Sequence, residues 1–147
     1  MVFSLLSKTS INEWLPYVAF IIPVFSGLRL AKFNIDERQT SSFIGLPTPA
    51  NAIFWGGLIL SFESFLSSYT WLLIILILLF SYLLVAEIPM FSLKFKNYAW
   101  KSNQTQYLFL IGCAVILAFF QLSAFPILIG WYIALSIGLS VFQKSEV

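Results

Sequence analysis

The stretch Leu72–Val85, LLIILILLFSYLLV, contains no charged residue, and its only polar residues are Ser81 and Tyr82. It lies inside a longer apolar run from about Trp71 to Met90. Crossing the hydrocarbon core of a bilayer as a helix takes roughly 20 mostly apolar residues. The run also lacks the alternation of apolar and polar positions that a transmembrane barrel strand shows. The stretch therefore predicts a membrane-spanning α-helix.

The composition of the whole chain indicates the same class. Of its 147 residues, 60% are hydrophobic and only 10% are charged, whereas charged residues make up about 25% of typical soluble domains. The mean hydropathy is +0.93. One water-soluble core in a chain of this length could not enclose so many apolar side chains. We expect an integral membrane protein that forms a single membrane domain over residues 1–147.

The numbers of histidines and cysteines and the net charge limit the functions that this chain can have. The chain has no histidine, which excludes imidazole catalysis and histidine metal ligands. It has one cysteine, Cys113, which cannot form an intramolecular disulfide. The formal net charge of +2 is too small to indicate a nucleic-acid partner.

Further apolar runs lie on both sides of Leu72–Val85. Since a spanning segment must satisfy its backbone hydrogen bonds internally, they predict an all-α, polytopic helical membrane protein of about five transmembrane helices. A short turn at Ser123–Pro126 predicts a tight hairpin between the last two. Residues 1–7 are too short to span and are expected to finish a helix whose beginning is missing. The expected spans are Trp14–Lys32, Pro49–Phe65, Trp71–Met90, Gln106–Leu122 and Phe125–Phe142.

The basic residues predict the orientation. If the spans alternate in direction, seven of the eight basic residues fall on one side, and only Lys8 falls on the other. The positive-inside rule places the basic side in the cytoplasm. The loops 33–47 and 91–104 and the C-terminus are therefore expected there. The seven residues are Arg29, Lys32, Arg38, Lys94, Lys96, Lys101 and Lys144.

The polar stretch Ser26–Asn51, SGLRLAKFNIDERQTSSFIGLPTPAN, is where a substrate at the membrane surface could bind. Arg29 and Lys32 share one helix face because they are three residues apart. For Lys32, snorkelling to the interface and setting the topology explain the position as well as a ligand does. Arg29 is expected to lie deeper, where an arginine needs an anionic partner.

The same stretch ends with a helix start at Thr48-Pro49. Threonine can cap a helix, and proline is tolerated in its first turn. The free N–H groups of a helix N-terminus favour anions, and Gly45 and Pro47 would shape the approach. An ordinary capped helix is the plainer alternative. Combined with Arg29 and Lys32, the motif predicts a phosphate-bearing lipid or nucleotide substrate.

Two carboxylates lie near the ends of predicted spans. Glu63 is expected at the outer interface. Glu87 is expected at the cytoplasmic end of its span, where it could pair with Lys94, Lys96 or a loop arginine. Either carboxylate raises a functional hypothesis by its position alone.

Three segments resemble one family: LRLAKFN at 28–34, FIGLPTPAN at 43–51 and AEIPMFSLKFK at 86–96. They are similar to bacterial phosphatidylserine synthases of the CDP-alcohol phosphatidyltransferase family, from near residue 1 to about Lys96. The resemblance implies a homodimeric helical enzyme of the bacterial inner membrane. Such an enzyme transfers a phosphatidyl group from CDP-diacylglycerol to serine, releases CMP, and uses Mg²⁺ or Mn²⁺. The candidate substrate-binding residues are Arg29, Lys32, Asn34, Gly45, Pro47 and Thr48.

One departure from the family is large. Its hallmark, D-x-x-D-G-x-x-A-R followed by G-x-x-x-D-x-x-x-D, supplies aspartates for metal binding and base catalysis. This chain has a single aspartate, Asp36, so no catalytic residue or metal ligand is expected in it. In the family the motif lies just before the helix that residues 1–6 would finish. The chain is therefore expected to be the C-terminal part of such an enzyme and to be inactive alone.

Two alternatives to an enzyme fragment remain. The first is a non-catalytic membrane protein that binds lipid or assists assembly. The second is a small transporter, which the mostly unbroken and nearly charge-free spans disfavour.

The predicted orientation can be tested by cysteine labelling. In intact cells, a thiol reagent that cannot cross the membrane should label Tyr69→Cys and should not label Ser42→Cys. Position 69 is expected outside, and position 42 lies in a loop expected to be cytoplasmic. Labelling at 42 without labelling at 69 would reverse the assignment.

Overall fold

The computed structural model describes residues 1–9, 12–36, 43–93, 100 and 103–145. The predicted all-α class is confirmed, with two very short strands added. The elements are α1 (Val2–Thr9), η1 (Leu15–Phe20), α2 (Ile21–Ile35), β1 (Phe43–Ile44), α3 (Thr48–Ser68), α4 (Thr70–Val85), β2 (Pro89–Met90), α5 (Gln104–Phe120), η4 (Gln121–Ser123) and α6 (Ala124–Ser145).

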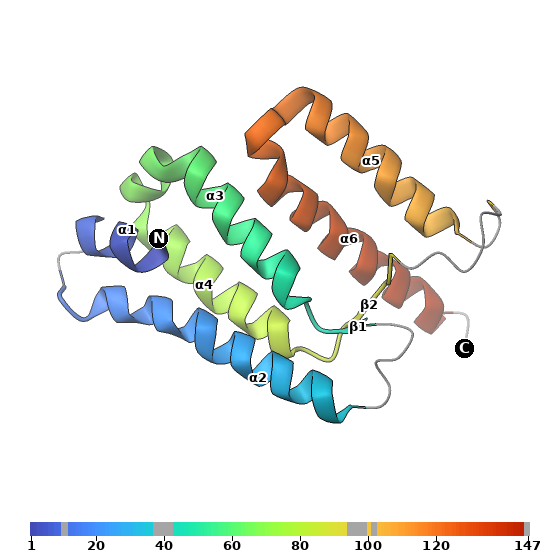
Figure 1. Cartoon of the computed structure of the whole chain (residues 1–147), viewed down its shortest axis with the longest axis horizontal. Coiled ribbons are helices and arrows are strands. Elements are labelled where there is room, and N and C mark those ends of the chain that lie inside the picture. Colours follow the sequence, from blue (N-terminus) through green and yellow to red (C-terminus); the bar gives the residue numbers. More distant parts are fainter. Residues whose placement is uncertain (10–11, 37–42, 94–99, 101–102, 146–147) are drawn as a thin grey trace.

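The long helices lie side by side; they alternate in direction along the chain, so the neighbours α2 and α4 run parallel (Figure 1). Across the picture their order is α2, α4, α3, α6 and α5. The packing agrees, because α2 contacts α4, α3 contacts both α4 and α6, and α5 contacts α6. One end of the bundle carries β1, β2 and the C-terminus, and we call it the strand end. The opposite end carries α1 and the turns of the α3–α4 and α5–α6 hairpins.

Two stretches among the described residues are long and apolar enough to cross a membrane. They are Leu15–Ile35 and Gln104–Val141, and the second comprises most of the α5–α6 hairpin. The apolar helix α4 is shorter. Its 16 residues rise about 24 Å at 1.5 Å per residue, against a hydrocarbon core of roughly 30 Å.

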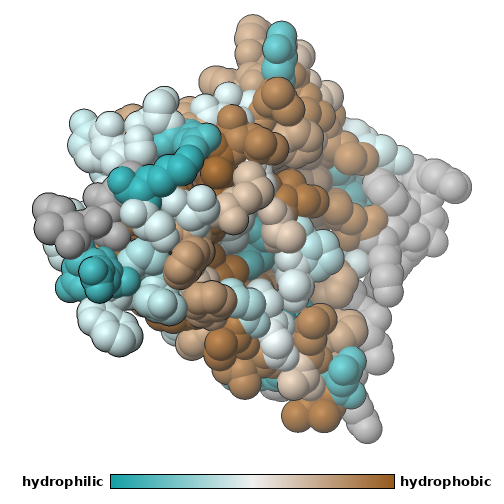
Figure 2. Space-filling model, turned by 60° about the vertical axis from the view of Figure 1, so that its left-hand side comes forward, coloured by the Kyte–Doolittle hydropathy of each residue, from teal (hydrophilic) through white to brown (hydrophobic). Residues whose placement is uncertain are grey.

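Large apolar side chains cover much of the outside of the bundle. The exposed fractions of Leu60, Trp71 and Phe119 are 71%, 77% and 79%. Figure 2 shows one such face, on which brown apolar side chains spread over the helices and a group of hydrophilic ones lies toward the left. Apolar patches this extended are rare on soluble monomers and mark contact with a membrane or a partner.

The helix α4 ends at Val85, five residues before the predicted end at Met90. The backbone becomes extended at Ala86, where φ is −60° and ψ is 144°. Further along, Pro89 disfavours a helical conformation for the residue before it. Pro89 and Met90 instead pair antiparallel with Ile44 and Phe43. The predicted end of this span was therefore wrong, and the small sheet was not predicted.

Two other local features differ from the expected pattern. The α5–α6 turn lies at Gln121–Ser123, ahead of the predicted Ser123–Pro126, and Gln121 has a positive φ of 47°. The helix α6 already begins at Ala124, because proline is tolerated in a first helical turn.

The helix α3 is interrupted at Phe62, whose φ is −130° and ψ is 26°. The short helix expected near residues 1–7 is present as α1.

The core lies on both sides of α3. Phe54 of α3 and Phe80 of α4 stack with ring centroids 3.7 Å apart. On the other side, Gly57 lets α6 approach closely, since a Cβ on Gly57 would lie 2.5 Å from the Cβ of Phe125. These two contacts fix α3 between α4 and α6, and with it the position of its first turn.

The segment before α3 is held against the end of α4. The Gly45 N–H donates to the Ile88 carbonyl at 2.9 Å, and the Leu46 N–H donates to the Leu83 carbonyl at 2.8 Å. Leu46 is fully buried. Gly45 has a φ of +78°, a conformation that other residues rarely adopt. This contact positions the strand end of the bundle.

The substitution Gly45→Ala should destabilise the protein by about 2 kcal/mol or more, because it combines an unfavourable φ with steric overlap. A Cβ at Gly45 would lie 2.6 Å from the Leu84 carbonyl oxygen and 2.9 Å from that of Ala86. Thermal unfolding in one detergent would measure the effect as a lower Tm. Gly56→Ala is the matched control.

At Gly56 a Cβ would meet no atom within 4 Å, and replacing a helical glycine by alanine stabilises by roughly 0.5–1 kcal/mol. The two substitutions should therefore change the Tm in opposite directions. Equal Tm values for both variants would contradict the role given to Gly45.

Candidate functional site

Arg29 is the only charged side chain that is buried among the described residues, with 3% of its surface exposed. It lies in the penultimate turn of α2, near the strand end. Its guanidinium carbon lies 5.3 Å from the centre of the Phe33 ring, within the range of a cation–π interaction. Arg29 is thus buried, with the Phe33 ring against its guanidinium.

No described carboxylate neutralises Arg29. The described ion pairs are Lys8–Glu63, at 3.6 Å, and Lys32–Glu87, at 3.2 Å. The Nε atom of Arg29 also has no hydrogen-bond partner. An unpaired buried charge costs several kcal/mol, and the planar guanidinium binds phosphate or carboxylate oxygens in pairs. The surroundings of Arg29 therefore favour an anionic ligand.

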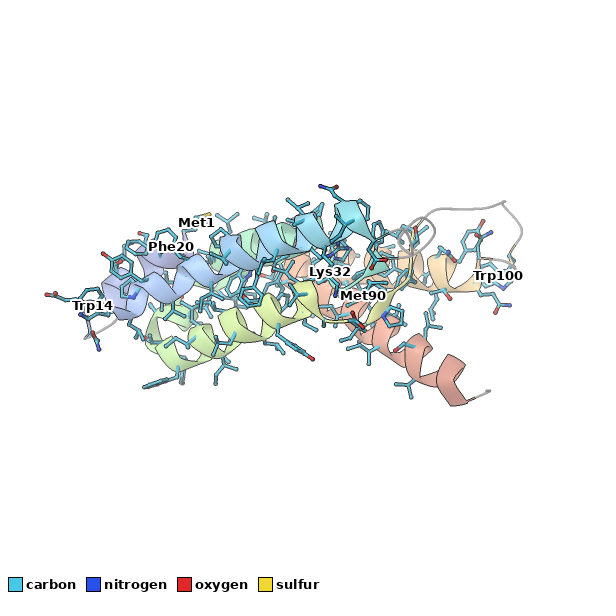
Figure 3. All side chains as sticks on the ribbon, turned by 90° about the horizontal axis from the view of Figure 1, so that it is seen from below. Met1, Trp14, Phe20, Lys32, Met90 and Trp100 are labelled. Carbon is cyan, nitrogen blue, oxygen red and sulfur yellow. The ribbon has the colours of Figure 1, made fainter. Side chains whose placement is uncertain are left out.

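Lys32, one turn further along α2, already has partners. Its Nζ donates to Glu87 Oε1 at 3.2 Å and to the Val85 carbonyl at 3.4 Å. Figure 3 shows Lys32 beside Met90, where α4 has ended. A cation at the C-terminal carbonyls of a helix is favourable. Lys32 thus ties α2 to the end of α4, and its own charge is balanced.

The partner of Glu87 in the described structure is therefore Lys32, which was not among the partners expected for it. Lys94 and Lys96, the lysines proposed for that pairing, lie outside the described residues, as does Arg38. At the other end of the bundle, Glu63 is exposed and pairs with Lys8.

The helix α3 begins at Thr48 as predicted, but Thr48 is not its cap. The cap position is occupied by Pro47, with φ −62° and ψ 135°, and no side chain caps the helix. Thr48 and Pro49 are the first two helical residues. The expected threonine cap was wrong, because the fixed φ of proline together with an extended ψ already makes Pro47 the last non-helical residue.

The first turn of α3 faces α2 across a hollow of about 470 Å³. Its polar wall consists of Ser26 from α2 and of Thr48 and Asn51 from α3. Asn51 is 3% exposed, and its Oδ1 has no hydrogen-bond partner. Arg29 does not line this hollow, since it lies on the neighbouring face of α2. The start of α3, which was predicted to face Arg29, faces Ser26 of α2 across this hollow.

The remaining candidates divide into structural and peripheral residues. Gly45 is pressed against the carbonyls of α4 and leaves no room for a ligand on that side. Pro47 sets the helix start. Asn34 is exposed in the last turn of α2. Of the predicted site, the structure brings Arg29 and Lys32 onto one part of α2 and places Thr48 across the hollow.

Sequence reasoning missed four residues of this region. Phe33 follows Arg29 by four positions, so helical spacing could have found it. Ser26 and Asn51 are polar residues next to apolar runs, which is also a readable signal. Tyr132 is far away in the sequence, and only the packing of α6 brings its hydroxyl to the Phe91 carbonyl at the strand end.

The described residues do not fit the divalent metal that the family resemblance implies. No group of three or more His, Cys, Asp or Glu side chains that could hold a metal ion occurs in the described part of the chain. A metal bound to phosphates needs carboxylate ligands in fixed geometry. No chemical step is therefore derived through a metal here.

Comparison with known proteins found no matching family model, no matching curated protein and no matching solved structure. The resemblance of the segments 28–34, 43–51 and 86–96 to phosphatidylserine synthases therefore stays a prediction.

Proposed function

We propose that this chain is the substrate-binding, C-terminal part of a phosphatidylserine synthase-like membrane enzyme of phospholipid biosynthesis. In this proposal Arg29 binds the anionic phosphate region of CDP-diacylglycerol. The observation that carries it is a buried guanidinium with no described carboxylate partner, near the strand end of an apolar helix bundle. The described parts of the three segments that resemble the family, 28–34, 43–51 and 86–93, lie at that end.

We further propose that the chain spans the bacterial inner membrane about five times, with the strand end in the cytoplasm. Arg29 and Lys32 belong to the strand-end half of α2, whereas Lys8 belongs to α1 at the opposite end. Trp14 and Trp100 lie at opposite ends of the molecule (Figure 3). Tryptophans at both interfaces are typical of membrane proteins. A cytoplasmic strand end would give Arg29 access to a nucleotide-bearing lipid.

The described residues would contribute binding and orientation. The guanidinium of Arg29 would hold phosphate oxygens, and the hydroxyl of Thr48 and the amide of Asn51 would hydrogen-bond a small polar acceptor in the hollow. By resemblance, serine is that acceptor and the active form is a homodimer. The aspartates and the Mg²⁺ or Mn²⁺ that the transfer would use must come from outside these 147 residues.

A non-catalytic lipid-binding or assembly subunit is the second candidate. It is favoured by one observation, namely that the whole sequence contains a single aspartate, Asp36. Both candidates share the binding of an anionic lipid at Arg29, and they differ in whether a chain that carries the aspartate motif completes an active enzyme.

The purified 147-residue chain should release no CMP from CDP-diacylglycerol and serine with Mg²⁺ or Mn²⁺, because it lacks the aspartate motif. Co-expression with a segment that carries this motif should restore release if the enzyme proposal is right. Metal-dependent CMP release by the chain alone would contradict the proposal. Failure of every motif-bearing segment, with lipid binding intact, would favour the non-catalytic subunit.

The substitution Arg29→Ala should weaken binding of CDP-diacylglycerol about tenfold or more, since hydrogen bonds to charged groups contribute roughly 1.5–3 kcal/mol. Arg29→Lys should recover only part of the affinity, because lysine cannot hold two oxygens in one plane. Binding to the detergent-solubilised chain can be measured by displacement of a fluorescent CDP-diacylglycerol analogue.

Lys8→Ala is the matched control, because it removes the same charge from the opposite end of the bundle, where Lys8 is exposed and pairs with Glu63. It should leave the affinity unchanged. If Arg29→Ala and Lys8→Ala variants of equal Tm bind the analogue equally well, Arg29 serves only as a topology signal.

A further inference from the structure

An apolar crevice of about 400 Å³ lies on the other side of the α3 start from the polar hollow. The helix α6 forms its floor, and α3 and α5 stand on either side, since both contact α6. Its lining is almost wholly apolar and includes Ile53 of α3, Cys113 of α5 and Leu128 of α6. The volume lies within the range of about 300–1,000 Å³ that ligand sites occupy.

The crevice is short enough to lie within the depth of one membrane leaflet. It begins at the strand end, where Phe43 and Phe91 line it, and reaches Phe125 near the start of α6. From Tyr132 back to Phe125 the helix rises about 10 Å, at 1.5 Å per residue. Half of a hydrocarbon core is roughly 15 Å thick. A single extended chain that enters from the strand-end leaflet would therefore fill it.

Arg29 lies just behind the strand end of this crevice. Phe43, which lines the crevice, has its ring centroid 6.2 Å from that of Phe33, and Arg29 lies over the Phe33 ring. Tyr132 also lines the crevice and donates its hydroxyl to the Phe91 carbonyl at 3.0 Å. The apolar crevice thus ends near Arg29, a cation that no described carboxylate neutralises.

We propose that the α3–α5–α6 crevice binds one acyl chain of an anionic phospholipid, with its phosphate at the strand end near Arg29. Apolar burial would supply the affinity, at about 0.8 kcal/mol per methylene, and the arginine would select the negative headgroup. The choice of headgroup rests on the proposed function, whereas occupation of the crevice by an acyl chain does not. In the enzyme this would hold the lipid substrate while its phosphate reacts.

The test uses the full chain in phosphatidylcholine nanodiscs that contain phosphatidic acid with a photoreactive diazirine in the middle of one acyl chain. After illumination, peptide mass spectrometry should place the label on crevice residues of α3, α5 and α6. Cys113→Trp, which fills the crevice, should lower this labelling roughly tenfold, equivalent to the burial of about two methylene groups. Ala50→Phe fills the same space from α3 and should act alike.

Ala114→Trp is the control, because Ala114 is the next residue on α5, is exposed and does not line the crevice. It should leave the labelling unchanged. Equal labelling of either folded filling variant and Ala114→Trp would overturn the proposal. The proposal would also be overturned if the crevice of the unchanged chain stays unlabelled and becomes labelled only when a filling variant converts a dimer into a monomer. In that case a second copy of the chain, and no acyl chain, occupies the crevice.

The headgroup is tested with phosphatidylcholine that carries the same diazirine. It should label the crevice less than phosphatidic acid does, and Arg29→Ala should abolish the difference. Crevice labelling that persists without any effect of Arg29→Ala would uphold the acyl-chain site and contradict the anion site of the proposed function. If Arg29→Ala abolishes headgroup selection while the crevice-filling variants have no effect, the anion site is upheld and the acyl-chain site is contradicted.

Discussion

The arrangement of the strand end depends on one contact, the docking of Gly45 and Leu46 onto the end of α4. Two backbone N–H groups there find carbonyl partners at Leu83 and Ile88. Leu46 is fully buried, and a buried N–H group without a partner is costly, so this pairing is needed. Because Gly45 has no Cβ, the loop can lie directly against the carbonyls. The start of α3 is set by this contact, and the hollow and the crevice lie on either side of it.

The two cations of α2 show how burial separates roles that look alike. Lys32 is partly exposed and is balanced by Glu87, so it joins two helices without needing a ligand. Arg29, one turn earlier, is buried against Phe33 and has no described carboxylate partner. A charge in that position raises the free energy of the protein unless an anion joins it. The difference in environment, more than the difference in residue type, distinguishes a cation that joins two helices from one without a described carboxylate partner.

The start of α3 separates a polar cavity from an apolar one. On the α2 side, Ser26, Thr48 and Asn51 offer hydroxyl and amide groups. On the α5–α6 side, the crevice offers almost only carbon atoms. An amphipathic molecule could occupy both environments at once, with its chain in one and polar groups near the other. Phospholipids have this division, which is why a lipid substrate suits the pair better than a wholly polar solute.

The sequence by itself determined the all-α class and the helix start near Thr48. Each of these depends on local properties, namely the length of apolar runs and the fixed φ of proline. The end of α4 could not be predicted, because Ala86–Met90 becomes extended only by pairing with β1. Nor could the Lys32–Glu87 pair, whose partners lie 55 residues apart, or the hydrogen bond from Tyr132 to the Phe91 carbonyl. Tertiary structure alone decided these features, because apolar helices have similar sequences and only their packing determines which faces contact each other.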